Sequence, residues 1–217
     1  MMTDFTKLTL AEMLAETEAI AADAQQSFGH LNAEQLNWKP AAAAWSVAQC
    51  LEHVMANDRL MLQAIDEVVS GNQDTRRAKL YERLPVLPGL FGKLMIKVVS
   101  PDFKQKLKSP PAGRPATSAI DAQVVNRFLT HQRDLAERIE WMERTSAEHI
   151  VITSPFVSLI TYRLLDACRL IVAHERRHLA QAQRVAQQVV AQQVVAQQVV
   201  AQQVVAQQVM DASGFPR

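Results

Sequence analysis

Hydrophobic residues recur along this chain at spacings of three and four, the period of a helix that is buried on one face. Such stretches cover residues 9–28, 46–71 and 118–143, and a fourth begins after Pro155 and runs through Val185. The pattern predicts an all-α protein. Four amphipathic helices pack most economically as a four-helix bundle.

The ends of the second helix carry specific signals. Ser46-Val47-Ala48-Gln49 predicts a capping box, in which the Ser46 hydroxyl accepts from the Gln49 amide and the Gln49 side chain accepts from the Ser46 amide. Gly71 is a good stop signal. The next segment, 72–117, contains a short amphipathic stretch at 90–99 and then a run rich in proline that cannot lie inside a helix. We therefore expect a long crossover between the second and third helices.

The end of the chain is unlike the rest. Residues 185–209 are five tandem copies of Val-Ala-Gln-Gln-Val. A step of five residues turns about 140° beyond a full helical turn, so the valine pairs wind around a helix and form no single stripe. We expect the repeats to extend the fourth helix by up to about 38 Å. A frayed tail and β-pairing between copies are the alternatives.

The chain thus divides into a folded domain at 1–184, the repeat tract at 185–209 and a short end at 210–217. Its 23 basic and 22 acidic residues give a net charge of +1, too little to gather nucleic acid or anionic lipid, so neither is an expected partner. No signal peptide or long apolar run is visible, which predicts a cytoplasmic protein. Cys50 and Cys168 lie in helical patterns and are expected to be free thiols.

Two histidines on the fourth helix are candidate metal ligands. His174 and His178 continue the apolar stripe formed by Ile160, Leu164, Ala167 and Ile171. At positions i and i+4 their rings project side by side, as two ligands of one ion must. The string 174–178 also fits the HExxH pattern of zinc proteases, but no later His or Glu could complete such a site.

A third ligand must therefore come from upstream, and His53 is the best placed. It lies two turns inside the second helix, on the flank of that helix's apolar stripe. For His53 to meet the pair on the fourth helix, the two helices must be antiparallel. The site would then lie toward one end of the bundle, bordered by the loop 29–45 and Trp45.

Three segments resemble the DinB-like family of metalloenzymes: Leu36-Asn37-Trp38-Lys39-Pro40, Ala44-Trp45-Ser46-Val47-Ala48-Gln49-Cys50-Leu51-Glu52-His53 and Ala173-His174-Glu175-Arg176-Arg177-His178-Leu179-Ala180-Gln181. The resemblance spans residues 8 to about 185 and implies a four-helix bundle with a three-histidine metal site, matched here by His53, His174 and His178. It also implies a homodimer and, from characterised relatives, transfer or isomerisation with low-molecular-weight thiols. The repeat tract departs from the family pattern.

Three imidazoles leave a coordination position open, where an ion can activate water or hold a thiol as its thiolate. We therefore expect a small-molecule substrate and a divalent transition metal, with zinc, nickel, copper and iron all compatible with the ligands. Thiol S-transferase-like chemistry is favoured over hydrolysis. A non-catalytic helical module, with a structural ion or none, is the rival interpretation.

Several other residues are weighed against ordinary structural roles. His131 is expected to be a core histidine with a hydrogen-bond partner, with a fourth metal ligand as the alternative. Glu175 either orients a ligand, pairs with a neighbouring arginine or is solvated. Cys50 is a weak candidate ligand, and Asn57 a weak candidate for a polar contact in the pocket. Trp45 is expected to anchor its loop.

Overall fold

The computed structural model describes residues 3–70, 87–105, 114–115, 119–157 and 160–212, and it is mainly helical. The α-helices are α1 (Leu10–Phe28), α2 (Ala33–Asn37), α3 (Val47–Val69), α4 (Leu87–Val99), α5 (Val124–Thr145) and α6 (Leu164–Ala212). Two 3₁₀ turns, η1 (Phe5–Lys7) and η5 (Ala147–His149), and an antiparallel pair of strands, β1 (Val151–Thr153) and β2 (Thr161–Arg163), complete it. The all-α fold class is confirmed.

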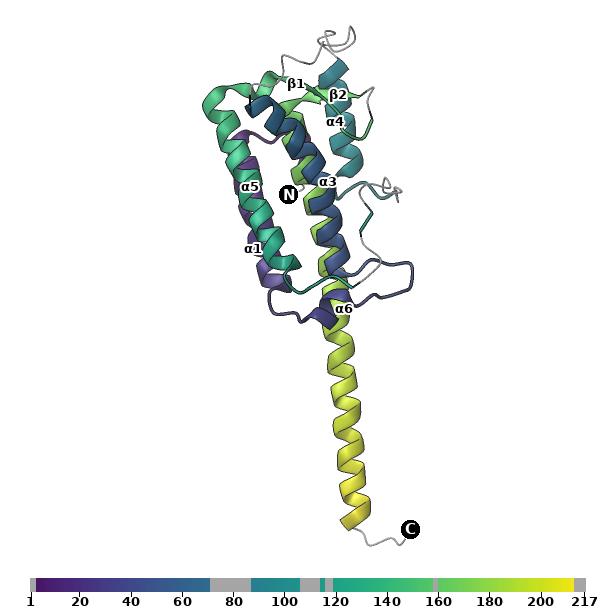
Figure 1. Cartoon of the computed structure of the whole chain (residues 1–217). Coiled ribbons are helices and arrows are strands. Elements are labelled where there is room, and N and C mark those ends of the chain that lie inside the picture. The colour runs from purple at the N-terminus through teal and green to yellow at the C-terminus, as the bar shows by residue number, and fades with distance from the viewer. Residues whose placement is uncertain (1–2, 71–86, 106–113, 116–118, 158–159, 213–217) are drawn as a thin grey trace.

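The helices α1, α3, α5 and α6 run alongside one another (Figure 1). α1 and α3 each contact both α5 and α6, while α4 packs on the outside against α6 and β2. α3 and α6 run in opposite directions along the molecule. Their facing sides, with those of α1 and α5, bury large apolar side chains, among them Met13, Ile20, Phe28, Leu51, Ile65, Phe128, Leu135, Ile139 and Ile171.

The start of α3 is held by a capping box. The Gln49 amide donates to Ser46 Oγ at 3.1 Å, and the Ser46 amide donates to Gln49 Oε1 at 3.3 Å. The predicted capping box is confirmed, and it fixes the first turn of the helix that carries His53. A short helix that was not predicted, α2, has its own capping box between Asn32 and Gln35. The predicted stop at Gly71 lies outside the described residues.

The predicted start of the third helix at residue 118 was wrong, because α5 begins only at Val124. Asn37, at the end of α2, explains part of the difference. Its Oδ1 accepts from the Ile120 amide at 2.9 Å and its Nδ2 donates to the Ile120 carbonyl at 2.7 Å. With both backbone groups of Ile120 bonded to one side chain, this residue is held outside the helix.

The predicted start of the fourth helix after Pro155 was also wrong. The chain first forms the hairpin β1–β2, in which Val151 pairs with Arg163, and α6 begins at Leu164. Ile160 therefore lies before the helix, and its carbonyl accepts from the Ser154 amide at 2.8 Å. The local sequence is rich in β-branched and aromatic residues, which favour strands. Tyr162 from this hairpin is buried, and its hydroxyl donates to Met61 Sδ at 3.2 Å.

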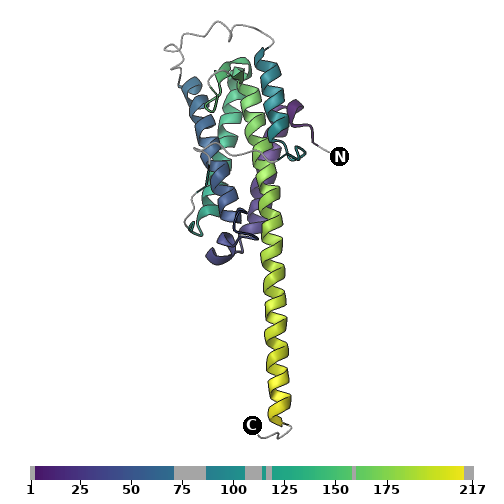
Figure 2. The ribbon, with the colours of Figure 1, turned by 90° about the vertical axis from the view of Figure 1, so that its right-hand side faces the viewer.

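α6 continues without interruption through the repeat tract and projects well beyond the other helices (Figure 2). Val185, Ala186 and Val189 are still buried, and from Val190 onward the described valines are 42–62% exposed. No helix in the described part of the chain is both long and apolar enough to cross a lipid bilayer.

Shortening the tail tests which repeats belong to the folded core. A chain ending at Gln193 keeps the last buried residue, Val189, and is expected to melt at the same temperature as the full chain. A chain ending at Arg184 loses Val185, Ala186 and Val189 and is expected to lose about 1.5–3 kcal/mol for each buried valine. Thermal melts followed by circular dichroism make this comparison.

The same measurement reports on the projecting helix. The chain that ends at Gln193 also lacks the helical residues 194–212. Its helical signal per molecule is therefore expected to be lower than that of the full chain. A signal per molecule that stays the same would contradict the helical extension.

Candidate metal centre

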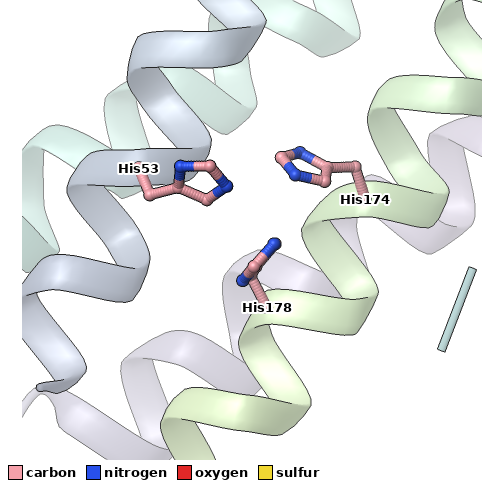
Figure 3. A group of neighbouring side chains, drawn as sticks. All are labelled: His53, His174 and His178. Atoms are coloured by element: carbon pink, nitrogen blue, oxygen red, sulfur yellow. The ribbon is translucent and has the colours of Figure 1, made fainter. Parts of the chain in front are cut away.

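Three imidazoles from two antiparallel helices meet at one place inside the molecule (Figure 3). The ring centroid of His53 on α3 lies 5.1 Å from that of His174 and 4.5 Å from that of His178, and the two α6 rings are 4.6 Å apart. Each residue offers one ring nitrogen within 4.8 Å of the other two. The three histidines therefore lie close together, as the sequence predicted.

The apolar stripes of the two helices explain this placement. On α3, His53 is 2% exposed and lies between the buried residues Leu51 and Val54. On α6, the most deeply buried positions include Val172, Glu175 and Leu179, so His174 and His178 lie on the flank of the core-facing side. Because that flank faces α3, the three rings share one space.

Polar side chains lie beside the rings of His53 and His174. The side-chain amide of Asn57, one turn along α3, lies 3.0 Å from His53 Nδ1 and donates to the His53 carbonyl at 2.7 Å. Nδ1 of His174 lies 3.9 Å from Asp58 Oδ1. In both rings the other nitrogen, Nε2, points into the space between the three rings (Figure 3). The contact expected of Asn57 is thus made with a candidate ligand.

His178 is held in the form that a metal needs. Burial, together with repulsion from His174, His53 and Arg177, lowers its pKa to about 2. The ring is therefore neutral, with a lone pair to offer, throughout the physiological range. Its Nδ1 is buried and has no hydrogen-bond partner in the described part of the chain. A set of three imidazoles of this kind fits a divalent transition-metal ion.

Trp45 lies against this group of rings. Its ring is 4.6 Å from the His53 ring and 5.7 Å from the His178 ring, on which it stacks at an angle of 26°. The residue is half-buried and directly precedes the Ser46 cap of α3. Trp45 therefore anchors its loop, as expected, and covers two of the three candidate ligands at the same time.

A second buried cluster lies beside the histidines and joins three helices. Nε2 of His131 on α5 lies 3.1 Å from Asp58 Oδ2 on α3 and 3.4 Å from Glu175 Oε1 on α6. Gln132 Nε2 donates to the same Glu175 oxygen at 2.6 Å. Asp58 and Glu175 are buried, and the His131 side chain is only 10% exposed. The cluster concentrates two carboxylates and one imidazole in the core.

The groups in this cluster shift one another's pKa values. Burial opposes the charge of His131, but its hydrogen bonds to Asp58 and Glu175 and their negative charges outweigh burial and raise its pKa to about 10. Burial raises the pKa of Glu175 to about 7, against the effect of its bond with His131. Burial likewise works against ionisation of Asp58, yet His131 and His174 hold its pKa below the ordinary value. His131 is therefore the cation of the cluster.

These contacts decide several of the open assignments. His131 is a hydrogen-bonded core histidine and lies among the carboxylates rather than among the three rings. Glu175 pairs with neither neighbouring arginine: Arg176 binds Glu16 and Asp23, and Arg177 donates to the carbonyls of Val98, Ser100 and Gln105.

Both cysteines are free and buried, as expected, and burial raises the pKa of each thiol to about 12. Cys50 belongs to neither cluster. The sequence interpretation missed Asp58. A signal was available, because this acid lies four residues after Val54 and three before Met61, on the buried stripe of α3.

The raised pKa of His131 has a consequence for stability. Folding raises this pKa from 6.5 to about 10, so the stabilisation is full below about pH 6.5 and is lost as the pH rises toward 10. In metal-free protein, the free energy of unfolding in urea is therefore expected to fall over this range in the wild type and to fall less in His131→Gln. His149→Gln, which changes an exposed histidine, is the control and should follow the wild type. Equal slopes for all three proteins would contradict the assignment.

Comparison with known proteins identifies the family of this chain. A family model described as the DinB superfamily matches residues 16–182, a range that includes both clusters. Over 160 residues the chain is 26% identical to the uncharacterized protein YuaE of Bacillus subtilis (strain 168), an alignment that covers 73% of this chain and 88% of that protein. No solved structure matches significantly. This chain belongs to the DinB superfamily.

Proposed function

We propose that this protein is a metal-dependent enzyme in which His53, His174 and His178 hold one divalent transition-metal ion. The observation that carries the proposal is the convergence of three ring nitrogens within 4.8 Å of one another. Membership of the DinB superfamily supports it. Zinc, nickel and iron are the ions that we consider first, because imidazole suits each of them.

Three protein ligands leave at least one coordination position for a small molecule, as in catalytic rather than structural zinc sites. An ion bound there would lower the pKa of a water or a thiol at that position. Trp45 covers one side of the His53 and His178 rings.

We favour a low-molecular-weight thiol as co-substrate, in a reaction of the thiol S-transferase class. The chain's own thiols are poorly suited to be the nucleophile, since Cys50 and Cys168 are buried and burial raises the pKa of each to about 12. A thiol that arrives from solution would avoid this difficulty. Hydrolysis by an activated water is the second candidate, and it uses the same open position.

The proposal includes the architecture around the site. We infer that α1, α3, α5 and α6 form the four-helix bundle expected from the sequence, since α1 and α3 each contact α5 and α6. The folded domain would then extend beyond the expected boundary at residue 184 to Val189, because Val185, Ala186 and Val189 are buried, and the remaining repeats would be appended to it. A homodimer remains our expectation from the family.

Metal analysis of the purified protein tests the site. The metal-free wild type, titrated with zinc, nickel or ferrous ion, is expected to bind about one ion per chain. His178→Ala is expected to bind at least about 100-fold more weakly, beyond the 10–100-fold that residues outside the ligand set usually contribute. His149→Ala, which removes an exposed histidine, should bind like the wild type. A His178→Ala variant with unchanged affinity would refute the ligand set.

Activity assays then separate the enzyme from the non-catalytic module. The metal-loaded wild type is expected to accelerate reaction of a low-molecular-weight thiol with an electrophile, and His178→Ala is expected to lack this activity. Acceleration of ester hydrolysis without thiol would favour the second candidate. A fully loaded protein that accelerates neither reaction would favour a structural ion.

A further inference from the structure

The histidine group and the carboxylate cluster are connected through Asp58. Its Oδ2 lies 3.1 Å from His131 Nε2, and its Oδ1 faces His174 Nδ1 at 3.9 Å. The side chain is buried, so these two imidazoles take the place of water around the carboxylate. Asp58 is therefore in contact with α5 through one oxygen and directed to a candidate metal ligand through the other.

A histidine that binds a metal through Nε2 carries its proton on Nδ1, and that proton needs an acceptor. An acceptor at this position fixes the tautomer, holds the ring plane and makes the imidazole a better donor to the ion. The distance of 3.9 Å between His174 Nδ1 and Asp58 Oδ1 is longer than a hydrogen bond, so a small rotation of the ring or the carboxylate is needed to close it.

The rest of the cluster keeps Asp58 in position. His131 lies between Asp58 and Glu175, and Gln132 binds Glu175 at 2.6 Å, so the chain of contacts runs from α3 through α5 to α6. A buried carboxylate without a partner would be costly, and the His131 ring provides that partner. α5 contributes no histidine to the three-ring group, but its His131 binds Asp58, the carboxylate that lies beside His174.

We propose that Asp58 is a positioning residue that orients His174 for metal binding, and that His131 and Glu175 hold Asp58 in place. This inference rests on the proposed function and adds to it a role for a second set of residues.

The alternative use of this cluster is a second metal site, because Asp58, His131 and Glu175 also present three ligand atoms close together. The geometry favours the positioning role. Nε2 of His131 already lies within 3.4 Å of an oxygen of each carboxylate, so its ring provides the compensating positive charge. Under our proposal the protein binds one ion, and His131→Gln still binds one ion.

Asp58→Asn tests the role, and the chain offers a matched control. Asp66, also on α3, makes an ion pair with Arg138 on α5 at 2.7 and 2.8 Å, two turns beyond Asp58. Asp66→Asn thus removes a contact between the same two helices without touching the histidines. Affinity is measured by competition of zinc between the protein and a chromophoric chelator. We expect Asp58→Asn to bind zinc about 10- to 100-fold more weakly than the wild type, and Asp66→Asn to bind it equally well.

Cobalt absorption provides a readout that a purely structural role would not change. With cobalt in place of zinc, Asp58→Asn is expected to keep one ion per chain but to shift the ligand-field bands, whereas Asp66→Asn should give the wild-type spectrum. If Asp58→Asn fails to fold, His131→Gln is used in its place. This variant keeps Asp58 but removes the imidazole that binds it. We expect His131→Gln to weaken zinc binding in the same direction and by a smaller factor.

The outcomes separate the two proposals. A wild type that binds no ion would overturn the proposed function, and this inference with it. A wild type that binds one ion, with folded Asp58→Asn equal to it in affinity and cobalt spectrum, would overturn only the role of Asp58. A second ion per wild-type chain, lost in Asp58→Asn while the first remains, would show instead that the cluster is a metal site of its own.

Discussion

The antiparallel contact between α3 and α6 is the constraint on which the candidate site depends. Each helix alone presents an ordinary amphipathic pattern, with buried residues such as Val54 on α3 and Ile171 on α6. When the two stripes pack in opposite directions, the early part of α3 lies opposite the first third of α6, and His53 meets His174 and His178. A shift of one helical turn, about 5.4 Å, would exceed the separation of these rings and break the group apart. Apolar packing therefore determines the geometry of the polar site.

Burying this many ionisable groups is unfavourable unless each has a compensating contact. The molecule meets this need in two different ways. Among the carboxylates it pairs opposite charges, with the His131 ring between Asp58 and Glu175. Among the three histidines it does the reverse, since burial and the neighbouring basic groups together hold the pKa of His178 far below the usual value. The first arrangement pairs an imidazole with carboxylates, whereas the second offers imidazole nitrogens to a cation. The two clusters thus differ in what they can bind although they are neighbours.

How far the sequence could predict this structure depended on the range of the interactions involved. The helices, the capping box at Ser46 and the meeting of His53 with the later pair follow from local periodicity and short motifs, and these were predicted. The delayed start of α5 depends on Asn37, which binds Ile120 from 83 positions away, and no local pattern reports such a contact. The hairpin β1–β2 was missed because a short apolar run fits a strand and a helix equally well. Asp58 was overlooked although it lies on the buried stripe of α3, and the partner that accounts for its burial, His131, is on another helix.

The repeat tract shows why an unusual segment can be added to such a fold without disturbing its site. A helix is specified residue by residue from its own hydrogen bonds, so material added beyond the last buried position does not rotate the residues before it. Val189 is that position in α6, and it lies eleven residues after His178, about three turns further on. The exposed valines that follow wind around the axis and offer no continuous stripe to a neighbouring helix. The orientation of His174 and His178 is therefore governed by the packing of α6 upstream of the exposed repeats. There α3 packs against α6, and Gln132 of α5 donates to Glu175 of α6.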